Sequence, residues 1–477
     1  MKNKPNIILI TIDALRADRL GFMGYEKNIS PNIDKLVQES AVFTNAFATG
    51  PGTPYSFPSI LTSTYPLDYM GPRQIGKPRV MISQVLKEQG YSTAAFHSSA
   101  YLSSFFGYDQ GWDFFEELFN PPKNIIFSPE KGIISKRKGV AFSFRQSLIN
   151  AFIKITFNSI PIFFFWTLYL KYKIKASKKV SKSDKSAISP ASFDKTIRDC
   201  IFSMKIQQAP FFLWVHYMDV HRYNDFPEEK NVSFLDFLAI VLPVFASDYY
   251  ASSNFIFKKF ARKHLKYSIN LYDQAVEKLD VKIKELLEFL KKNDLYNNSI
   301  ICLTADHGEE FLEHEGTDHI TDKLYNELLK VPLLIKIPGK SPQKITKKVS
   351  LIDLPSTLCE LSGVNVPGAF KGKNLFNYDR EIIFHQSGWA GEDKIEKWVE
   401  VEKFTECRAA CQSENWKYII NHGNEKEELY DLKKDPGERA NLAFKNEKTL
   451  FEMRERVKEF EKTNPPLALL KKGEKVF

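Results

Sequence analysis

Two segments far apart in the chain carry the residue types that hold divalent cations in proteins. The first reads ITIDALRAD and places Asp13 directly after a short apolar run. The second reads LTADHGEEFLEH and places Asp306 and His307 after another apolar run. Carboxylate oxygens and an imidazole nitrogen are suitable ligands for Mn²⁺, Mg²⁺, Ca²⁺ or Zn²⁺. We therefore expect these three side chains to bind one divalent metal ion.

A third segment, GPGTPYSFPSILTS, supplies a hydroxyl group that could attack an ester. Thr53 precedes Pro54 in this segment, which predicts a helix that begins here. The free N–H groups and the dipole of a helix N-terminus favour an anion. A hydroxyl bound to a cation loses its proton more easily and becomes a usable nucleophile. The segment thus predicts attack by Thr53 on an anionic ester of phosphorus or sulfur, with simple helix capping as the alternative.

One arginine lies close to the first acidic segment. Arg16 could clamp the anion of a substrate, or it could pair with Asp18 two residues later. Both interpretations are open from the sequence.

An α/β fold must position these residues, because strand-like and helix-like segments alternate along the chain. Apolar runs predict strands at 7–11, 41–46, 92–97, 210–215, 299–304 and 331–337, and periodic segments predict helices at 31–39, 54–61, 81–89, 265–292 and 352–361. This order favours a mainly parallel sheet covered by helices, in which ligands bind at the carboxyl ends of strands. Asp13 and Asp306 both fall at such ends.

The pattern also suggests how the chain is divided. We expect a large catalytic domain at residues 1–365 and a small C-terminal α+β subdomain at 366–477, where short strands are predicted at 381–385, 416–420 and 427–431. Two stretches, about 121–190 and 225–260, break the α/β pattern and are interpreted as insertions into the large domain.

In their order along the chain, these segments resemble the sulfatase family of the alkaline-phosphatase superfamily over nearly the whole length, the insertions excepted. Asp13, Asp306 and His307 match the family's metal ligands, and Thr53 falls on its nucleophile. Residues 428–442, ELYDLKKDPGERANL, are similar to its C-terminal signature. The resemblance implies an alkaline-phosphatase-like sandwich and a metal-dependent ester hydrolase, with Thr53 also contacting the metal.

Further site residues are implied by the resemblance alone. His216, Asp219 and His221 lie in WVHYMDVH, which resembles the family's middle motif, and His319 resembles its substrate-contacting lysine or histidine. This implies substrate binding by the three histidines and proton transfer by His221 and His319. Alternatively, Asp219, His221 and His319 could hold a second metal ion, as in two-metal members of the superfamily.

The nucleophile segment departs from the pattern of true sulfatases. Those enzymes convert a Cys or Ser to formylglycine, guided by a downstream Pro and Arg, whereas this chain has Thr53, Tyr55 and Phe57 at the three positions. Threonine cannot form that aldehyde, so we expect no formylglycine. Ser56 offers a rival start for the nucleophile motif, but Ile60 then stands at the position of the Arg.

Three functions follow in order of preference. The favoured one is hydrolysis of phosphate mono- or diesters, or phosphoryl transfer, through a covalent phospho-threonine. The alternatives are a sulfuric ester hydrolase acting on a sulfated glycan or lipid, and a non-catalytic binding module with the same fold.

Composition limits the partners and the compartment. The net charge of +9 suits a small-molecule, glycan or lipid-linked anionic substrate, and no nucleic-acid-binding motif is present. Five scattered cysteines are typical of a reducing compartment, and the first apolar run is short for a secretory signal, so we expect a cytoplasmic protein. The hydrophobic and lysine-rich stretch 155–185 could contact the inner membrane face; a buried insertion helix is the alternative.

Overall fold

The structure is a computed structural model of the 477-residue chain. It describes residues 4–69, 71–72, 75–76, 78–118, 125–128, 132–136, 190–224, 255–319, 323–389 and 406–464. The chain forms two compact units, the first made of residues 1–118, 191–223 and 272–477, and the second of residues 119–190 and 224–271. All residues of the candidate site lie in the first unit.

A nine-stranded sheet forms the centre of the first unit, in the order β12-β2-β11-β8-β1-β7-β3-β4, with β13 also paired to β2. The strands are β1 (Asn6–Ile12), β2 (Ala41–Phe47), β3 (Ser92–His97), β4 (Phe114–Glu117), β7 (Phe211–Tyr217), β8 (Ser299–Ala305), β11 (Lys330–Lys336), β12 (Gln343–Ile345) and β13 (Val349–Ser350). Only β11 runs antiparallel to its neighbours, β2 and β8, among the described strands of this sheet. The prediction of a mainly parallel sheet is confirmed.

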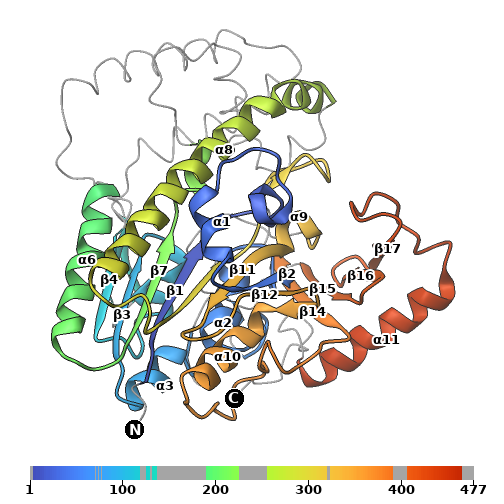
Figure 1. The fold of residues 1–477 in the computed structure, drawn as a ribbon. Coiled ribbons are helices and arrows are strands. Elements are labelled where there is room, and N and C mark those ends of the chain that lie inside the picture. The colour runs from blue at the N-terminus through green and yellow to red at the C-terminus, as the bar shows by residue number, and fades with distance from the viewer. Residues whose placement is uncertain are drawn as a thin grey trace. The chain divides into compact units, whose positions relative to one another are not determined.

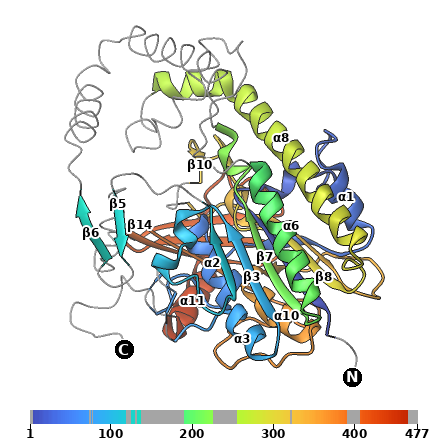
Figure 2. The same cartoon turned by 90° about the vertical axis from the view of Figure 1, so that its left-hand side faces the viewer.

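The inner strands are apolar on both faces because helices cover both faces. Every residue of β1, β7 and β8 is buried, as expected for parallel strands between two helical layers. Figures 1 and 2 show α6 and α8 on one face and α2, α3 and α10 on the other. Every strand and helix that the sequence predicted for the large domain is present, and apart from the start of α8 the ends differ by a few residues at most.

The helices are α1 (Pro31–Val37), α2 (Thr53–Thr62), α3 (Ile82–Glu88), α6 (Pro190–Ile206), α8 (Phe255–Lys292), α9 (Asn326–Leu329), α10 (Leu354–Leu361) and α11 (Glu447–Thr463). Short 3₁₀ helices occur at Ala17–Arg19, Gly21–Met23, Ala100–Leu102, Ser104–Phe106, His221–Asn224 and Leu351–Asp353. Among the helices that the sequence predicted, α8 differs most, because it begins ten residues earlier than expected. The sequence analysis predicted neither α6 nor α11.

A carboxylate from α8 caps α1 from outside. Asp280 is 1% exposed and accepts hydrogen bonds from the N–H groups of Asn32 at 3.1 Å and Ile33 at 2.8 Å. These N–H groups belong to the first turn of α1 and have no partner within the helix. One side chain therefore both caps α1 and fixes it against α8.

We expect Asp280→Ala to lower the free energy of unfolding by about 1–3 kcal/mol, because it leaves buried N–H donors without an acceptor. Urea unfolding followed by circular dichroism measures this effect. Glu288→Ala, at an exposed position of the same helix, is the matched control and should change the value by less than about 0.5 kcal/mol. Equal effects of the two substitutions would show that the cap contributes nothing.

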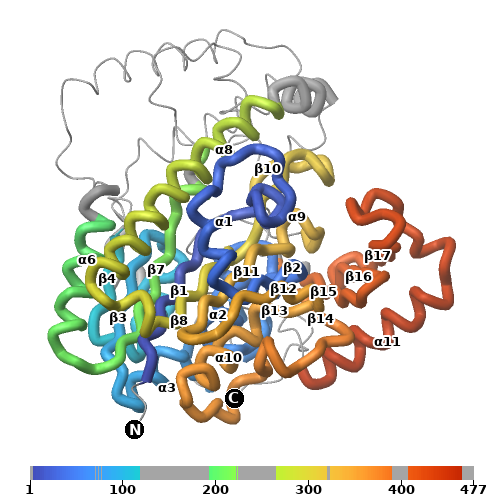
Figure 3. The backbone as a smooth tube through the Cα atoms, in the orientation of Figure 1, coloured from blue at the N-terminus to red at the C-terminus, as the bar shows by residue number. Residues whose placement is uncertain are grey.

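A second, antiparallel sheet follows in the C-terminal part of the chain, in the order β14-β15-β16-β17. Its strands are β14 (Ile383–Trp389), β15 (Glu406–Gln412), β16 (Trp416–Asn421) and β17 (Lys426–Asp431). Helix α11 packs on one face of this sheet, where Cys411, Tyr418, Leu429, Met453 and Val457 form a buried cluster; the tube in Figure 3 shows the helix beside the strands. A small C-terminal α+β region is thus confirmed, and β15 is a strand that the sequence analysis did not predict.

The second unit is described only in part. Strands β5 (Ile125–Ser128) and β6 (Gly132–Lys136) pair antiparallel within it. The stretch 155–185, for which membrane contact was considered, lies outside the described residues. Within the parts of the chain that the structure describes, no helix is long and apolar enough to cross a membrane.

Candidate active site

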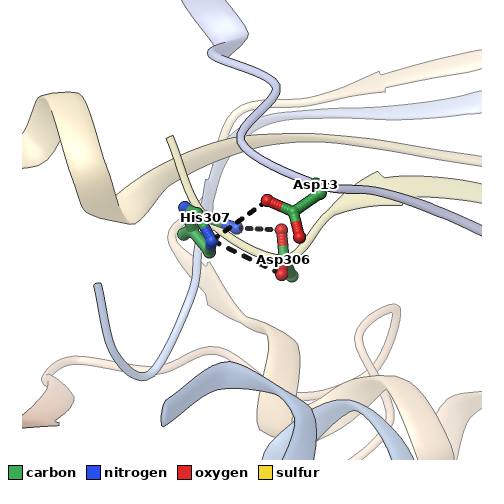
Figure 4. Close-up of side chains that lie close together, drawn as sticks. All are labelled: Asp13, Asp306 and His307. Atoms are coloured by element: carbon green, nitrogen blue, oxygen red, sulfur yellow. Dashed lines mark hydrogen bonds and ion pairs between the residues drawn. The ribbon is translucent and has the colours of Figure 1, made fainter. Parts of the chain in front are cut away.

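The two acidic segments meet because their strands are neighbours. β1 and β8 pair in parallel up to Ile12 and Ala305, so Asp13 and Asp306 leave the sheet at the same edge. Figure 4 shows the two carboxylates turned toward each other with the His307 ring beside them. His307 Nε2 lies 3.5 Å from Asp13 Oδ1 and 3.5 Å from Asp306 Oδ2. The sequence-based expectation that these three side chains converge agrees with this geometry.

Thr53 completes this group from another element. It is the first residue of α2, and Gly52 takes the capping position before it. The Thr53 hydroxyl oxygen lies 3.2 Å from Asp13 Oδ2, 3.0 Å from Asp306 Oδ2 and 3.4 Å from His307 Nε2. The hydroxyl therefore points at the acidic pair, and the geometry differs from the capping alternative.

The donor set fits a divalent cation. The ligand atoms of Asp13, Asp306 and His307 all lie within 4.8 Å of one another, and all three residues are 0% exposed. Asp13 Oδ1 is buried without a hydrogen-bond partner among the described residues. Two buried carboxylates this close repel each other, and a bound cation would compensate both charges.

The pKa directions of the two carboxyl groups reflect this crowding. Burial, and then the charge of Asp13, raise the pKa of Asp306. Burial also acts to raise the pKa of Asp13, but the charge of His221, a hydrogen bond with His216 and the charge of His307 outweigh it and lower that pKa. The surroundings thus hold Asp13 ionised next to a partner that resists ionisation.

His216 supports Asp13. Its Nε2 lies 3.3 Å from Asp13 Oδ2 and its Nδ1 lies 3.0 Å from the Thr11 hydroxyl, which also accepts a hydrogen bond from the Trp214 indole. The ring is completely buried on β7. Both ring nitrogens contact protein groups, so His216 orients the Asp13 carboxylate in this structure, and the expected substrate contact by His216 stays a prediction.

Arg16 is also engaged by the protein. Its guanidinium donates to Asp18, to Glu313 and to the carbonyl of Glu309, and only 6% of the residue is exposed. Of the two interpretations left open by the sequence, the structure has the pairing with Asp18. A substrate clamp by Arg16 would require these bonds to break.

Two histidines expected to act in proton transfer lie beside the acidic group. The ring centroid of His319 lies 4.5 Å from that of His307 and 4.8 Å from that of His221. Burial acts to lower the pKa of His319, but Asp318 and Glu309 overcome it and raise that pKa well above the ordinary value. The two carboxylates therefore favour the imidazolium form of His319, which is the form that donates a proton.

The acids beside His319 differ from the one expected for a second metal site. Asp219 pairs with Lys282 at 2.5 Å in this structure, and its role as a metal ligand stays a prediction. Instead, Glu309 and Asp318 lie 2.9 Å and 2.7 Å from His319 Nδ1. The sequence analysis assigned no role to either; Glu309 was present in the Asp-His-Gly-Glu motif, and Asp318 directly precedes His319.

The departures from the sulfatase nucleophile motif have a structural explanation. Tyr55 is 2% exposed and donates from its hydroxyl to the Gly388 carbonyl of β14. Phe57 is completely buried and contacts Trp214 and His216 at ring distances of 5.4 Å and 4.9 Å. Both side chains therefore have packing roles, and they hold this turn of α2 against β14 and β7.

A mainly parallel sheet between helices, with a small antiparallel sheet at the C-terminal end, defines the alkaline-phosphatase-like fold class. The family model described as Sulfatase matches residues 5–364, and the model described as N-sulphoglucosamine sulphohydrolase, C-terminal, matches residues 316–463. The chain belongs to the sulfatase family.

Individual relatives are distant. Arylsulfatase K of Canis lupus familiaris is 28% identical over 211 residues, and Delta 4,5-hexuronate-2-O-sulfatase of Bacteroides thetaiotaomicron is 29% identical over 192 residues. These matches cover 42% and 38% of this chain, and 38% of the length of each relative. Among solved structures, the phosphonate monoester hydrolase of Agrobacterium radiobacter has a TM-score of 0.63 at 18% identity, covering 98% of this chain and 97% of that one.

Proposed function

We propose that this protein is a metal-dependent hydrolase of anionic esters in which Thr53 is the nucleophile, with phosphate mono- and diesters favoured over sulfate esters. The observation that carries the proposal is the position of the Thr53 hydroxyl within 3.2 Å of two buried carboxylates. Asp13, Asp306, His307 and the Thr53 hydroxyl would hold one divalent cation. When bound, this cation would lower the pKa of the hydroxyl and attract the ester anion.

The protein's own groups then account for the remaining steps. The Thr53 oxygen forms a bond to phosphorus as the bond to the leaving oxygen breaks, and the proton of the hydroxyl passes to the solvent. His319, held protonated by Glu309 and Asp318, donates its proton to the leaving oxygen, with His221 beside it. Water, or an acceptor alcohol in a phosphoryl transfer, then attacks phosphorus as the bond to the Thr53 oxygen breaks. The attacking hydroxyl gives its proton to the now neutral His319, and the Thr53 oxygen takes a proton back from the solvent.

The choice between phosphorus and sulfur depends on the nucleophile. Threonine offers one hydroxyl and no route to formylglycine, and the adjacent positions Tyr55 and Phe57 are packed in the core. The phosphonate monoester hydrolase with the same fold supports the phosphorus ester. Arylsulfatase K supports a sulfate ester as the second candidate, and the hexuronate sulfatase supports a sulfated sugar as its substrate. A non-catalytic module is disfavoured because Asp13, Thr53, Asp306 and His307, here called the metal group, are all present.

Turnover of three matched aryl esters tests the proposal. We expect measurable hydrolysis of the aryl phosphate or the aryl phosphodiester, faster than that of the aryl sulfate, with activity lost in chelator and restored by a divalent cation. Thr53→Ala protein prepared in parallel is the control for a contaminating phosphatase. Turnover of the sulfate alone would overturn the preference for phosphorus, and no turnover of any ester at any cation concentration would overturn the enzymatic proposal.

A further inference from the structure

The loop that carries Asp306 and His307 rests on the backbone of α9. The Gly308 N–H donates to the Leu328 carbonyl at 2.8 Å, and the Glu309 N–H donates to the Glu327 carbonyl at 3.1 Å. A Cβ atom on residue 308 would lie 1.9 Å from the Glu327 oxygen, so only glycine permits this approach. The position of the loop therefore follows the position of α9.

A buried ion pair from the C-terminal region holds the first residue of α9. Lys417 Nζ, on β16, lies 2.8 Å from Glu438 Oε1, and neither side chain has exposed surface. Both partners also bind Asn326. Lys417 Nζ donates to the side-chain oxygen of Asn326 at 3.1 Å, and the backbone N–H of Asn326 donates to Glu438 Oε2 at 2.7 Å. Each member of the ion pair thus makes one hydrogen bond to the first residue of α9.

A second connection joins Glu438 to the same loop through His314. His314 Nε2 lies 2.9 Å from the Glu438 carbonyl, and its Nδ1 lies 2.5 Å from Glu327 Oε1. Glu438 has a φ of +54°, in the left-handed region that non-glycine residues seldom adopt. Such a conformation persists where surrounding contacts hold it in place. For Glu438 these are the contacts with Lys417, Asn326 and His314.

We propose that Glu438 and Lys417 are positioning residues for the active site, acting through α9 on the loop that carries Asp306, His307 and His319. The C-terminal sheet would thereby belong to the catalytic machinery, although neither residue touches the metal group. The effect on turnover rests on the function proposed above, whereas the effect on loop order does not.

Two double variants separate the loss of the Lys417–Glu438 ion pair from the loss of the hydrogen bond to the Asn326 N–H. Lys417→Met with Glu438→Leu removes the ion pair and both bonds to Asn326, while Lys417→Met with Glu438→Gln keeps an acceptor for the Asn326 N–H. Both avoid an unpaired buried charge, which would unfold the protein for a trivial reason. The readouts are amide hydrogen exchange of the peptide containing Gly308 and Glu309, and kcat with the aryl ester that the wild-type protein hydrolyses.

We expect the leucine variant to exchange these amides about tenfold faster or more and to lose about 10–100-fold in kcat, as supporting residues of metal sites do. The glutamine variant should stay within about threefold of wild type in both readouts. Wild-type exchange and wild-type kcat in the leucine variant would overturn the proposal, as would equal losses in the two variants. Faster exchange in a protein that hydrolyses none of the esters would support the positioning and contradict only the proposed function.

A matched control removes another ion pair of the same region. Arg454→Met with Glu427→Leu deletes a contact of 2.6 Å between α11 and β17 that does not involve α9. Exchange of the 308–309 peptide should stay at the wild-type rate, and acceleration equal to that of the Lys417 variant would overturn the proposal.

Should the leucine variant fail to fold, substitutions at Asn326 test the same connection. Asn326→Pro deletes the N–H that Glu438 accepts, and proline is tolerated at a first helical position after an extended residue such as Tyr325. Asn326→Ala keeps the N–H. We expect faster exchange at Gly308 and Glu309 for proline and not for alanine, and equal exchange in the two variants would contradict the proposal.

Discussion

Thr53→Ala should lower kcat by about 10³-fold or more while the protein stays folded and still binds a divalent cation. The hydroxyl is the single group of residue 53 that faces Asp13, Asp306 and His307. Its removal leaves the three strand-end ligands and the helix unchanged, since alanine is a good helix former. Steady-state kinetics and metal analysis of the purified variant measure the two parts of this prediction.

Ser56→Ala is the matched control. Ser56 lies one turn further along α2 and donates from its hydroxyl to the Gly50 carbonyl, away from the acidic pair. It is also the rival nucleophile that the sequence offers. We expect this variant to keep kcat within about tenfold of wild type. If Ser56→Ala abolished turnover and Thr53→Ala did not, the nucleophile assignment would be wrong.

Asp306→Asn should abolish the stabilisation that a divalent cation gives to the wild-type protein. At a cation concentration one hundred times its Kd, the wild type should gain about 2.7 kcal/mol in the free energy of unfolding. The variant loses a carboxylate ligand and should gain almost nothing. Without cation it should be as stable as the wild type or more stable, because asparagine removes a buried charge that repels Asp13.

Thermal unfolding with and without Mn²⁺ measures this difference. Asp219→Asn provides the control, because Asp219 pairs with Lys282 and stands apart from the metal group. It should show the same Mn²⁺-dependent rise in melting temperature as the wild type. An unchanged rise in Asp306→Asn would mean that the cation binds elsewhere.

The sequence was sufficient for the parts of the site that follow directly from strand ends. Asp13 and Asp306 each terminate an apolar run, and parallel strands bring such residues to one edge of the sheet. Thr53 was identifiable because Pro54 marks a helix start. The order of motifs along the chain then gave the family and the fold.

Other features depend on contacts that spacing does not reveal. Nothing in WVHYMDVH tells that His216 faces Asp13 while Asp219 turns to Lys282 on α8. Helix α9 lies between the loop of Asp306 and His307 and the C-terminal sheet. Its position depends on Lys417 and Glu438, which are distant in sequence from residue 306. Ionic residues are normally exposed, so the complete burial of this pair could not be predicted from composition.

The central claim is that four side chains from separate parts of the chain hold one cation beside the nucleophile. A crystal grown with Mn²⁺ and measured at the manganese absorption edge tests it most directly. We predict one anomalous peak within about 2.5 Å of Asp13, Asp306, His307 and the Thr53 hydroxyl. A manganese peak bound elsewhere, with these four side chains left as a hydrogen-bonded cluster, would contradict the account.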